Sequence, residues 1–186
     1  IKDYSADGVR VGLMLSSAAG NDLLFDTSLC EQGKSFSNKL WNSFRLISGW
    51  KVSKISQPDY CNISLVWFNN KFNYVLKQIN EDFSRFRISD ALMKIYKLIW
   101  DDFCSILLEI IKPKYGRPID LKTYDTLIKI FEKNLIILHP FMPFISEEIW
   151  HLISNRSNNP IVISKWPNVE KNINHNILED FQNLQS

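Results

Sequence analysis

The chain of 186 residues is 45% hydrophobic and 23% charged, which is the composition of a globular protein and excludes wholesale disorder. A chain of this length can bury a core without disulfides or metals. Its longest apolar runs, such as residues 135–138, are too short to cross a bilayer, so we expect no membrane contact. The net charge of +2 does not by itself indicate a nucleic-acid partner, so the local distribution of charge has to decide that question.

Metal binding and catalysis find little support in the sequence. The cysteines are widely spaced and lie near no histidine: Cys30, Cys61 and Cys104. Because zinc sites need clustered ligands, we expect no metal site and interpret these residues as buried free thiols in a reducing cytoplasm. His139 precedes a proline among apolar residues, which favours a capping or core histidine over a catalytic base. No phosphate-binding glycine loop and no nucleophile motif occurs, so we expect no catalytic residue.

The first part of the chain predicts a short helix and a long one. Apolar residues at spacings of three and four indicate a helix over residues 6–16, followed by an extended or turn segment at 23–25. Asp26 or Ser28 can cap a second helix that runs to about Ser48, and Gly49 can end it. The apolar face of this helix would consist of Leu29, Phe36, Leu40, Phe44 and Ile47.

Further helices follow along the chain. Apolar positions over 65–86 predict one, and a second starts at Ser89 or Asp90 and ends before Pro113. Asp120 caps another helix that reaches residue 138, and the prolines at 140 and 143 mark the start of the next. Residues 160–166 resemble a strand, and a weak helix begins near residue 175. Long helices joined by short loops predict an all-α, up-and-down antiparallel bundle with a short N-terminal helical extension.

Positive charge is concentrated in one part of the chain. No acidic residue occurs between Glu31 and Asp59, and this window holds Lys34, Lys39, Arg45, Lys51 and Lys54. Cations without nearby counter-charges create a local positive field that the net charge hides. A polyanion such as RNA is therefore a candidate partner for this segment.

One stripe of the second helix combines the residue types that bind RNA. At about 100° per residue, Lys34, Asn38, Trp41 and Arg45 fall within roughly 60° of one another, with Asn42 at the edge. Cations neutralise phosphates, amides read base edges, and aromatic rings stack on unpaired bases. The same pattern also fits a solvated helix face on which Trp41 packs against a neighbouring helix.

Blocks of sequence also occur in the order in which class I aminoacyl-tRNA synthetases carry them. They are residues 4–10 (YSADGVR), 20–26 (GNDLLFD), 32–42 (QGKSFSNKLWN), 99–104 (IWDDFC) and 138–150 (LHPFMPFISEEIW). Several class I synthetases share the last block, whereas the third and fourth resemble the valine–tRNA ligases in particular. The chain is therefore similar to the C-terminal, anticodon-binding region of the bacterial valine–tRNA ligase family.

This resemblance implies a module that binds the anticodon side of a valine-specific tRNA and has no cofactor of its own. ATP and magnesium are expected for the whole enzyme, which attaches valine to its tRNA. The family's HIGH and KMSKS motifs and its editing insertion are absent, and Ile1 is not an initiator methionine. We therefore expect a part of a longer cytoplasmic, monomeric protein, with the catalytic domain of the same protein as a partner.

The family's layout also implies domain boundaries. Residues 1–25 would be the tail of the catalytic and stem-contact region, 26–155 the anticodon-binding bundle, and 156–186 an extension toward a C-terminal arm. The tRNA-binding residues would be Lys34, Asn38, Lys39, Trp41, Asn42 and Arg45. Two alternatives stay open, namely the same region of an isoleucine– or leucine–tRNA ligase, and a helical scaffold module with no role in RNA binding.

Overall fold

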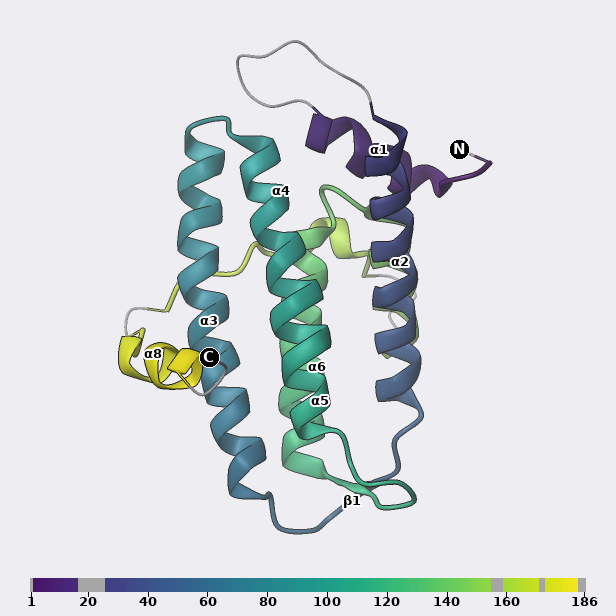
Figure 1. Ribbon diagram of the computed structural model, residues 1–186. Helices are drawn as coiled ribbons and strands as arrows, with labels where there is room; N and C mark the ends of the chain where they lie inside the picture. Colours follow the sequence, from purple (N-terminus) through teal and green to yellow (C-terminus); the bar gives the residue numbers. More distant parts are fainter. Residues whose placement is uncertain (1, 17–25, 155–158, 171–172, 184–186) are drawn as a thin grey trace.

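Long helical rods that run alternately up and down form the body of the molecule (Figure 1). The computed structural model describes residues 2–16, 26–154, 159–170 and 173–183. The rods are α2, α3, a continuous α4–η1–α5 rod in which η1 has π-helical turns, and α6. The elements in chain order are α1 (Ser5–Ser16), α2 (Thr27–Ser48), β1 (Val52–Ser53), α3 (Asp59–Ser84), α4 (Ile88–Lys97), η1 (Leu98–Leu107), α5 (Leu108–Ile111), β2 (Ile119–Asp120), α6 (Leu121–Leu138), α7 (Pro143–Ile153), η2 (Ile161–Ile163) and α8 (His175–Asn183). The predicted all-α, up-and-down bundle is confirmed.

α2, α6 and α7 begin where the signals in the sequence place them. The Asp26 carboxylate accepts a hydrogen bond from the Ser28 N–H at 2.8 Å, and the Asp120 carboxylate accepts one from the Thr123 N–H at 2.8 Å. These bonds satisfy N–H groups that have no partner within the helix itself. Pro143 stands at the start of α7, where its missing N–H costs no helical hydrogen bond. Local chemistry therefore sets these boundaries.

Aromatic side chains join the rods in the core. The Phe103 ring of η1 stacks on Phe131 of α6 at 5.2 Å between centroids and meets the edge of Phe68 of α3 at 5.6 Å. All three are fully buried. Burying a side chain of this size contributes about 2–3 kcal/mol to folding, so this cluster is a main source of the bundle's cohesion.

The α1 helix lies across the N-terminal half of α2 at very close range (Figure 1). A Cβ atom on Gly33 would lie 2.8 Å from the backbone oxygen of Gly8 and 2.9 Å from its Cα. A Cβ atom on Gly12 would lie 2.4 Å from the Cys30 sulfur. These distances are far shorter than van der Waals contact, so the two helices can approach this closely only because glycine occupies both positions.

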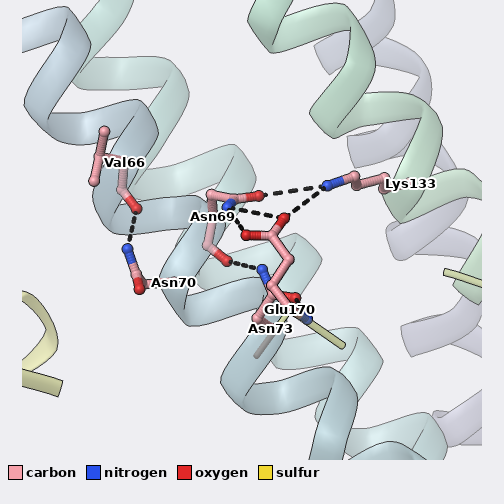
Figure 2. A network of polar contacts seen from close by, with 6 residues as sticks. All are labelled: Val66, Asn69, Asn70, Asn73, Lys133 and Glu170. Atoms are coloured by element: carbon pink, nitrogen blue, oxygen red, sulfur yellow. Dashed lines mark hydrogen bonds and ion pairs between the residues drawn. The ribbon is translucent and has the colours of Figure 1, made fainter. Parts of the chain in front are cut away.

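Asparagines on α3 hold the C-terminal segment against the bundle (Figure 2). The Asn73 side-chain oxygen accepts from the Glu170 N–H at 2.9 Å, and the Asn69 amide donates to the Glu170 carboxylate at 3.1 Å. Lys133 of α6 adds an ion pair to the same carboxylate at 3.7 Å. Lower on α3, Trp67 stacks on Phe181 of α8 with ring centroids 4.0 Å apart. The described residues from Trp166 onward therefore pack on the outside of α3, whereas η2 lies against α7.

Two expectations about local structure are wrong. Residues 160–166 contain a short 3-10 turn, η2, instead of a strand, because only Ile161 is buried and Val162 and Ile163 point outward. Phe86 is not part of the helical core: α3 ends at Ser84, so the ring sits in the following turn with 85% of its surface exposed. The segment predicted as extended at 23–25 lies outside the described residues.

Candidate nucleic-acid interface

The exposed edge of α2 consists of Asn38, Asn42 and Arg45. It is exposed because Phe36, Leu40, Ile47 and their neighbours turn the opposite side of α2 into the core. Within the described ranges these three polar side chains have no hydrogen-bond or ion-pair partner in the protein. Their donors and acceptors are therefore open to a ligand, as the stripe predicted from the sequence requires.

Lys34 lies at the N-terminal end of the predicted stripe and is partly engaged by the protein. Its ammonium group donates to the backbone oxygen of Asp3 at 2.8 Å. Together with Asn38 it borders an open depression that Lys2, Asp3 and Glu31 also line. Because acids and lysines alternate here, this end of the stripe has less free positive charge than the Arg45 end.

Lys39 points away from the exposed edge and toward the bundle. Its ammonium group donates to the Ser105 hydroxyl at 2.8 Å and lies 4.7 Å from the centre of the Trp100 ring. A cation over an indole ring is held by the ring's negative face. The structure therefore gives Lys39 a role in joining α2 to η1, and it does not bring Lys39 together with the other residues of the predicted site.

Trp41 is half-buried at the margin of the core. Its ring lies 5.5 Å from that of Phe44, tilted by 46°. One part of the indole thus packs on its own helix and the bundle, and the remaining part is accessible to a stacked base. Packing and stacking are compatible in this geometry, so the role of Trp41 in binding stays a prediction.

Two motif residues that had no assigned role prove to be ties between distant helices. The Asp7 carboxylate of α1 accepts from the Ile145 N–H at 2.8 Å and from the Phe144 N–H at 3.3 Å, at the start of α7. Arg10 donates to the backbone oxygen of Pro140 at 2.9 Å and to that of Phe141 at 3.2 Å. Burial raises the pKa of Asp7, although the two backbone hydrogen bonds and the charge of Arg10 oppose the shift.

α6 ends at Leu138, and His139 is the cap residue that follows it. Its Nδ1 lies 2.8 Å from the Ser146 hydroxyl oxygen, and that hydroxyl donates to the Met142 backbone oxygen at 2.7 Å. Burial lowers the pKa of His139, while the nearby Glu147 and Asp7 raise it and Arg10 lowers it. The ring therefore belongs to the hydrogen bonding of the turn between α6 and α7.

The cysteines are free and buried. Cys104 accepts a hydrogen bond from the Ser43 hydroxyl at 3.1 Å, and burial raises its pKa to about 11. In the described part of the chain no group of three or more histidine, cysteine or acidic side chains is placed to hold a metal ion. None of the described helices combines the length and apolar character needed to span a membrane.

The site is therefore an exposed polar edge on one rod of an all-α bundle. Residues 66–186 match the family described as the anticodon-binding domain of tRNA ligase. The chain therefore belongs to the anticodon-binding domain family of tRNA ligases.

The relatives of the chain are valine–tRNA ligases. It is 53% identical over 183 residues to the valine–tRNA ligase of Christiangramia forsetii, with 97% of this chain and 21% of the relative covered. It is 46% identical over 182 residues to that of Phocaeicola vulgatus, with 98% and 21% covered. A more distant valine–tRNA ligase, from Symbiobacterium thermophilum, is 32% identical over 164 residues, which cover 84% of this chain and 18% of the relative. The chain thus spans about a fifth of the length of the curated relatives it matches.

The fold also occurs in a solved structure. The agnB2 LeuRS of Agrobacterium radiobacter K84, crystallised in a ternary complex with tRNA and LeuAMS, superposes with a TM-score of 0.62. The superposition covers 95% of this chain and 20% of that one, at 19% sequence identity. This likeness shows that the two share the helical fold.

Proposed function

We propose that this chain binds the anticodon side of a valine tRNA through the exposed edge of α2, as the recognition module of a valine–tRNA ligase. The observation that carries the proposal is the set Asn38, Asn42 and Arg45, which lies on α2 within a segment, residues 32–58, that is free of acidic residues. It is supported by membership of the anticodon-binding family and by relatives that are valine–tRNA ligases.

The chemistry of the edge matches the parts of an RNA loop. Arg45, with its planar set of donors, would bind backbone phosphates, and Lys34 would add a weaker contact at the other end. The amides of Asn38 and Asn42 both donate and accept, so they suit the Watson–Crick edges of unpaired bases. The accessible part of Trp41 would stack on one base. Lys39 contributes less than these residues because Ser105 and Trp100 already hold it.

In the whole enzyme this module would hold the far end of the tRNA so that its acceptor end reaches the catalytic domain of the same protein. ATP and magnesium would act there, in valine activation and transfer. A monomer in the cytoplasm is the arrangement that fits this role. The same region of an isoleucine– or leucine–tRNA ligase, or a helical scaffold, would share the fold but would not prefer valine tRNA.

A titration of labelled valine tRNA and a non-cognate tRNA at two salt concentrations tests the proposal. Arg45→Ala should weaken the binding of both tRNAs and make the slope of log K against log salt shallower by about one. Asn38→Ala with Asn42→Ala should reduce the preference for valine tRNA and leave the slope unchanged. Lys39→Ala is the matched cation control on the same helix. Wild-type affinity in the Arg45 variant would contradict the proposed interface.

A further inference from the structure

The strands β1 and β2 meet at one end of the bundle (Figure 1). The segments around them carry a second basic surface. The two strands pair in parallel, Val52 opposite Ile119, and the Ile119 N–H donates to the Lys51 backbone oxygen at 2.8 Å. This short pairing brings the loop after α2 beside the loop between α5 and α6. Residues that are far apart in the sequence therefore share one surface.

The segments joined in this way carry an excess of cations. Residues 49–59 and 112–129 contain three acids, Asp59, Asp120 and Asp125, against seven cations. The Asp120 carboxylate is used in capping α6, and Lys112 forms an ion pair with Glu109. We call the other six cations the basal patch: Lys51, Lys54, Lys114, Arg117, Lys122 and Lys129. No side chain of the basal patch forms an ion pair with any residue that the structure describes.

An open groove of about 550 Å³ runs between the two halves of the basal patch. Lys54 lies on one side, and Lys122 and Lys129 lie on α6 on the other. The exposed side chains of Ile55 and Leu121 also line the groove, together with Thr126 and one acid, Asp125. A groove with three cations against one acid, and with apolar side chains beside them, can hold a flexible anionic chain that also carries flat apolar groups.

Tyr115 stands beside this surface on a tight turn. The turn is closed by a hydrogen bond from the Arg117 N–H to the Lys114 backbone oxygen at 2.9 Å, with Gly116 at a φ of +73°. The Tyr115 side chain is fully exposed, at 106% of its reference surface. An aromatic ring that is held out into solvent between two cations packs on nothing in this fold, so both of its faces are open to a stacked ligand.

We propose that the turn at 114–117 and the groove beside it form a second RNA contact, in which Tyr115 stacks on an unpaired base and the basal patch neutralises the flanking phosphates. The inference rests on the proposed function in that the RNA is the anticodon arm held by α2. Arg45 lies in the last turn of α2, immediately before the loop that carries Lys51 and Lys54. An RNA arm bound along the exposed edge of α2 therefore continues toward this surface.

The residue types favour RNA over an acidic protein or a lipid headgroup. A single-stranded loop presents planar bases next to regularly spaced phosphates, and an aromatic ring flanked by cations is complementary to that pattern. A lipid surface offers anionic headgroups but no planar ring on which Tyr115 could stack, and Ile55 and Leu121 line the groove among polar side chains. The bound segment would be the unpaired loop, since a duplex offers no free base for Tyr115.

Fluorescence anisotropy with a labelled stem–loop of the valine anticodon arm, and with a duplex of the same stem, tests the inference. Tyr115→Ala should weaken stem–loop binding by about tenfold or more, with an unchanged salt slope and an unchanged melting temperature. Tyr115→Phe keeps the ring and should bind within about twofold of the wild type. Lys122→Ala combined with Lys129→Ala should make the salt slope shallower by roughly 1.5 to 2 units.

Matched controls come from the opposite end and the outer face of the bundle. Phe86 is an exposed aromatic ring between two arginines in the turn after α3, and Lys77 is an exposed lysine on α3. Alanine at either position should leave stem–loop binding unchanged. If Tyr115→Ala and Phe86→Ala lose the same amount of stem–loop affinity, the inference is overturned, because nonspecific binding of RNA to exposed aromatic side chains would explain both results.

The variants also separate this inference from the proposed function. If Arg45→Ala weakens binding while Tyr115→Ala and the double lysine variant bind like the wild type, the second contact is refuted and the α2 interface stands. If the basal variants weaken binding and Arg45→Ala does not, the second contact stands and the α2 interface is refuted. Basal variants that lose binding to anionic phospholipid vesicles but keep stem–loop binding would refute the assignment to RNA.

Discussion

The carboxylate of Asp7 and the backbone N–H of Ile145 are 138 residues apart in the sequence and 2.8 Å apart in the structure. Asp7 lies on α1 and Ile145 in the first turn of α7, so one side chain supplies the cap that α7 does not find in its own preceding residue, Met142. This contact gives a physical role to two sequence blocks that resemble those of class I synthetases, residues 4–10 and 138–150. Asp7 in the first block fastens α1 to the start of α7, which lies in the second.

Asp7→Ala should lower the free energy of unfolding by about 1–2 kcal/mol, because the Phe144 and Ile145 N–H groups lose their acceptor. Burial raises the pKa of Asp7 despite its two backbone hydrogen bonds and Arg10, so burying the carboxylate has a cost that keeps the expected loss moderate. Asp7→Asn retains one acceptor oxygen and should cost less. Urea denaturation followed by circular dichroism measures both variants, and an Asp7→Ala variant as stable as the wild type would contradict the capping role.

Gly33→Ala should destabilise the chain by about 1–3 kcal/mol, because the new methyl group would lie 2.8 Å from the Gly8 backbone oxygen and would force α1 away from α2. Ser35→Ala, two residues later on the exposed side of α2, is the control and should be nearly neutral or slightly stabilising. Thermal melts of the two variants test this prediction. Equal melting temperatures would contradict it and would mean that α1 can move away from α2 without a loss of stability.

Trp41→Ala should affect stability and binding together. Because the ring is only half-buried, we expect a stability loss of about 2 kcal/mol, below that of a fully buried tryptophan. Loss of stacking should weaken tRNA binding by about 1–3 kcal/mol without changing the salt slope. Binding is measured at a temperature where both proteins are folded, with Trp41→Phe as the control. A destabilised variant that binds tRNA normally would leave Trp41 with a packing role alone.

The stability of the chain should fall as the pH drops through the ordinary pKa of histidine. The folded pKa of His139 is lowered from 6.5 by burial, so the unfolded chain takes up a proton at a pH where the folded chain does not. The free energy of unfolding is therefore at its full value, as far as His139 is concerned, above about pH 6.5 and decreases progressively below it. His139→Asn removes this titration and keeps an amide within reach of Ser146. Its urea midpoint should depend less on pH between about 7 and 5.5 than that of the wild type, and parallel curves would rule out His139 as the source.

Cys104 should resist alkylation in the native state. With its pKa raised to about 11 and its sulfur buried beside Ser43, it should react with iodoacetamide on the order of 100-fold more slowly than an ordinary thiol near pH 8. Mass spectrometry of tryptic peptides, with and without denaturant, measures the rate at each cysteine. Rapid native labelling at Cys104 would show that η1 opens to solvent on the time scale of the reaction.

The elements of this fold follow from short-range chemistry, and for that reason the sequence by itself determined them. Asp26 and Asp120 reach N–H groups only two or three residues away, and the periodic apolar positions of α2 define its buried face without knowledge of its neighbours. The exposed edge of Asn38, Asn42 and Arg45 follows from the same periodicity.

Only the tertiary structure decided which charges are free. Lys34 and Lys39 belong to the same acid-free segment as Arg45, yet one is held by the Asp3 backbone and the other by Ser105 and Trp100. The basal patch was not visible from the sequence, because a parallel pairing of two residues on each side assembles it and so short a strand has no recognisable pattern. Helical periodicity is a local property, whereas the partners of a long cationic side chain belong to elements at any distance along the chain.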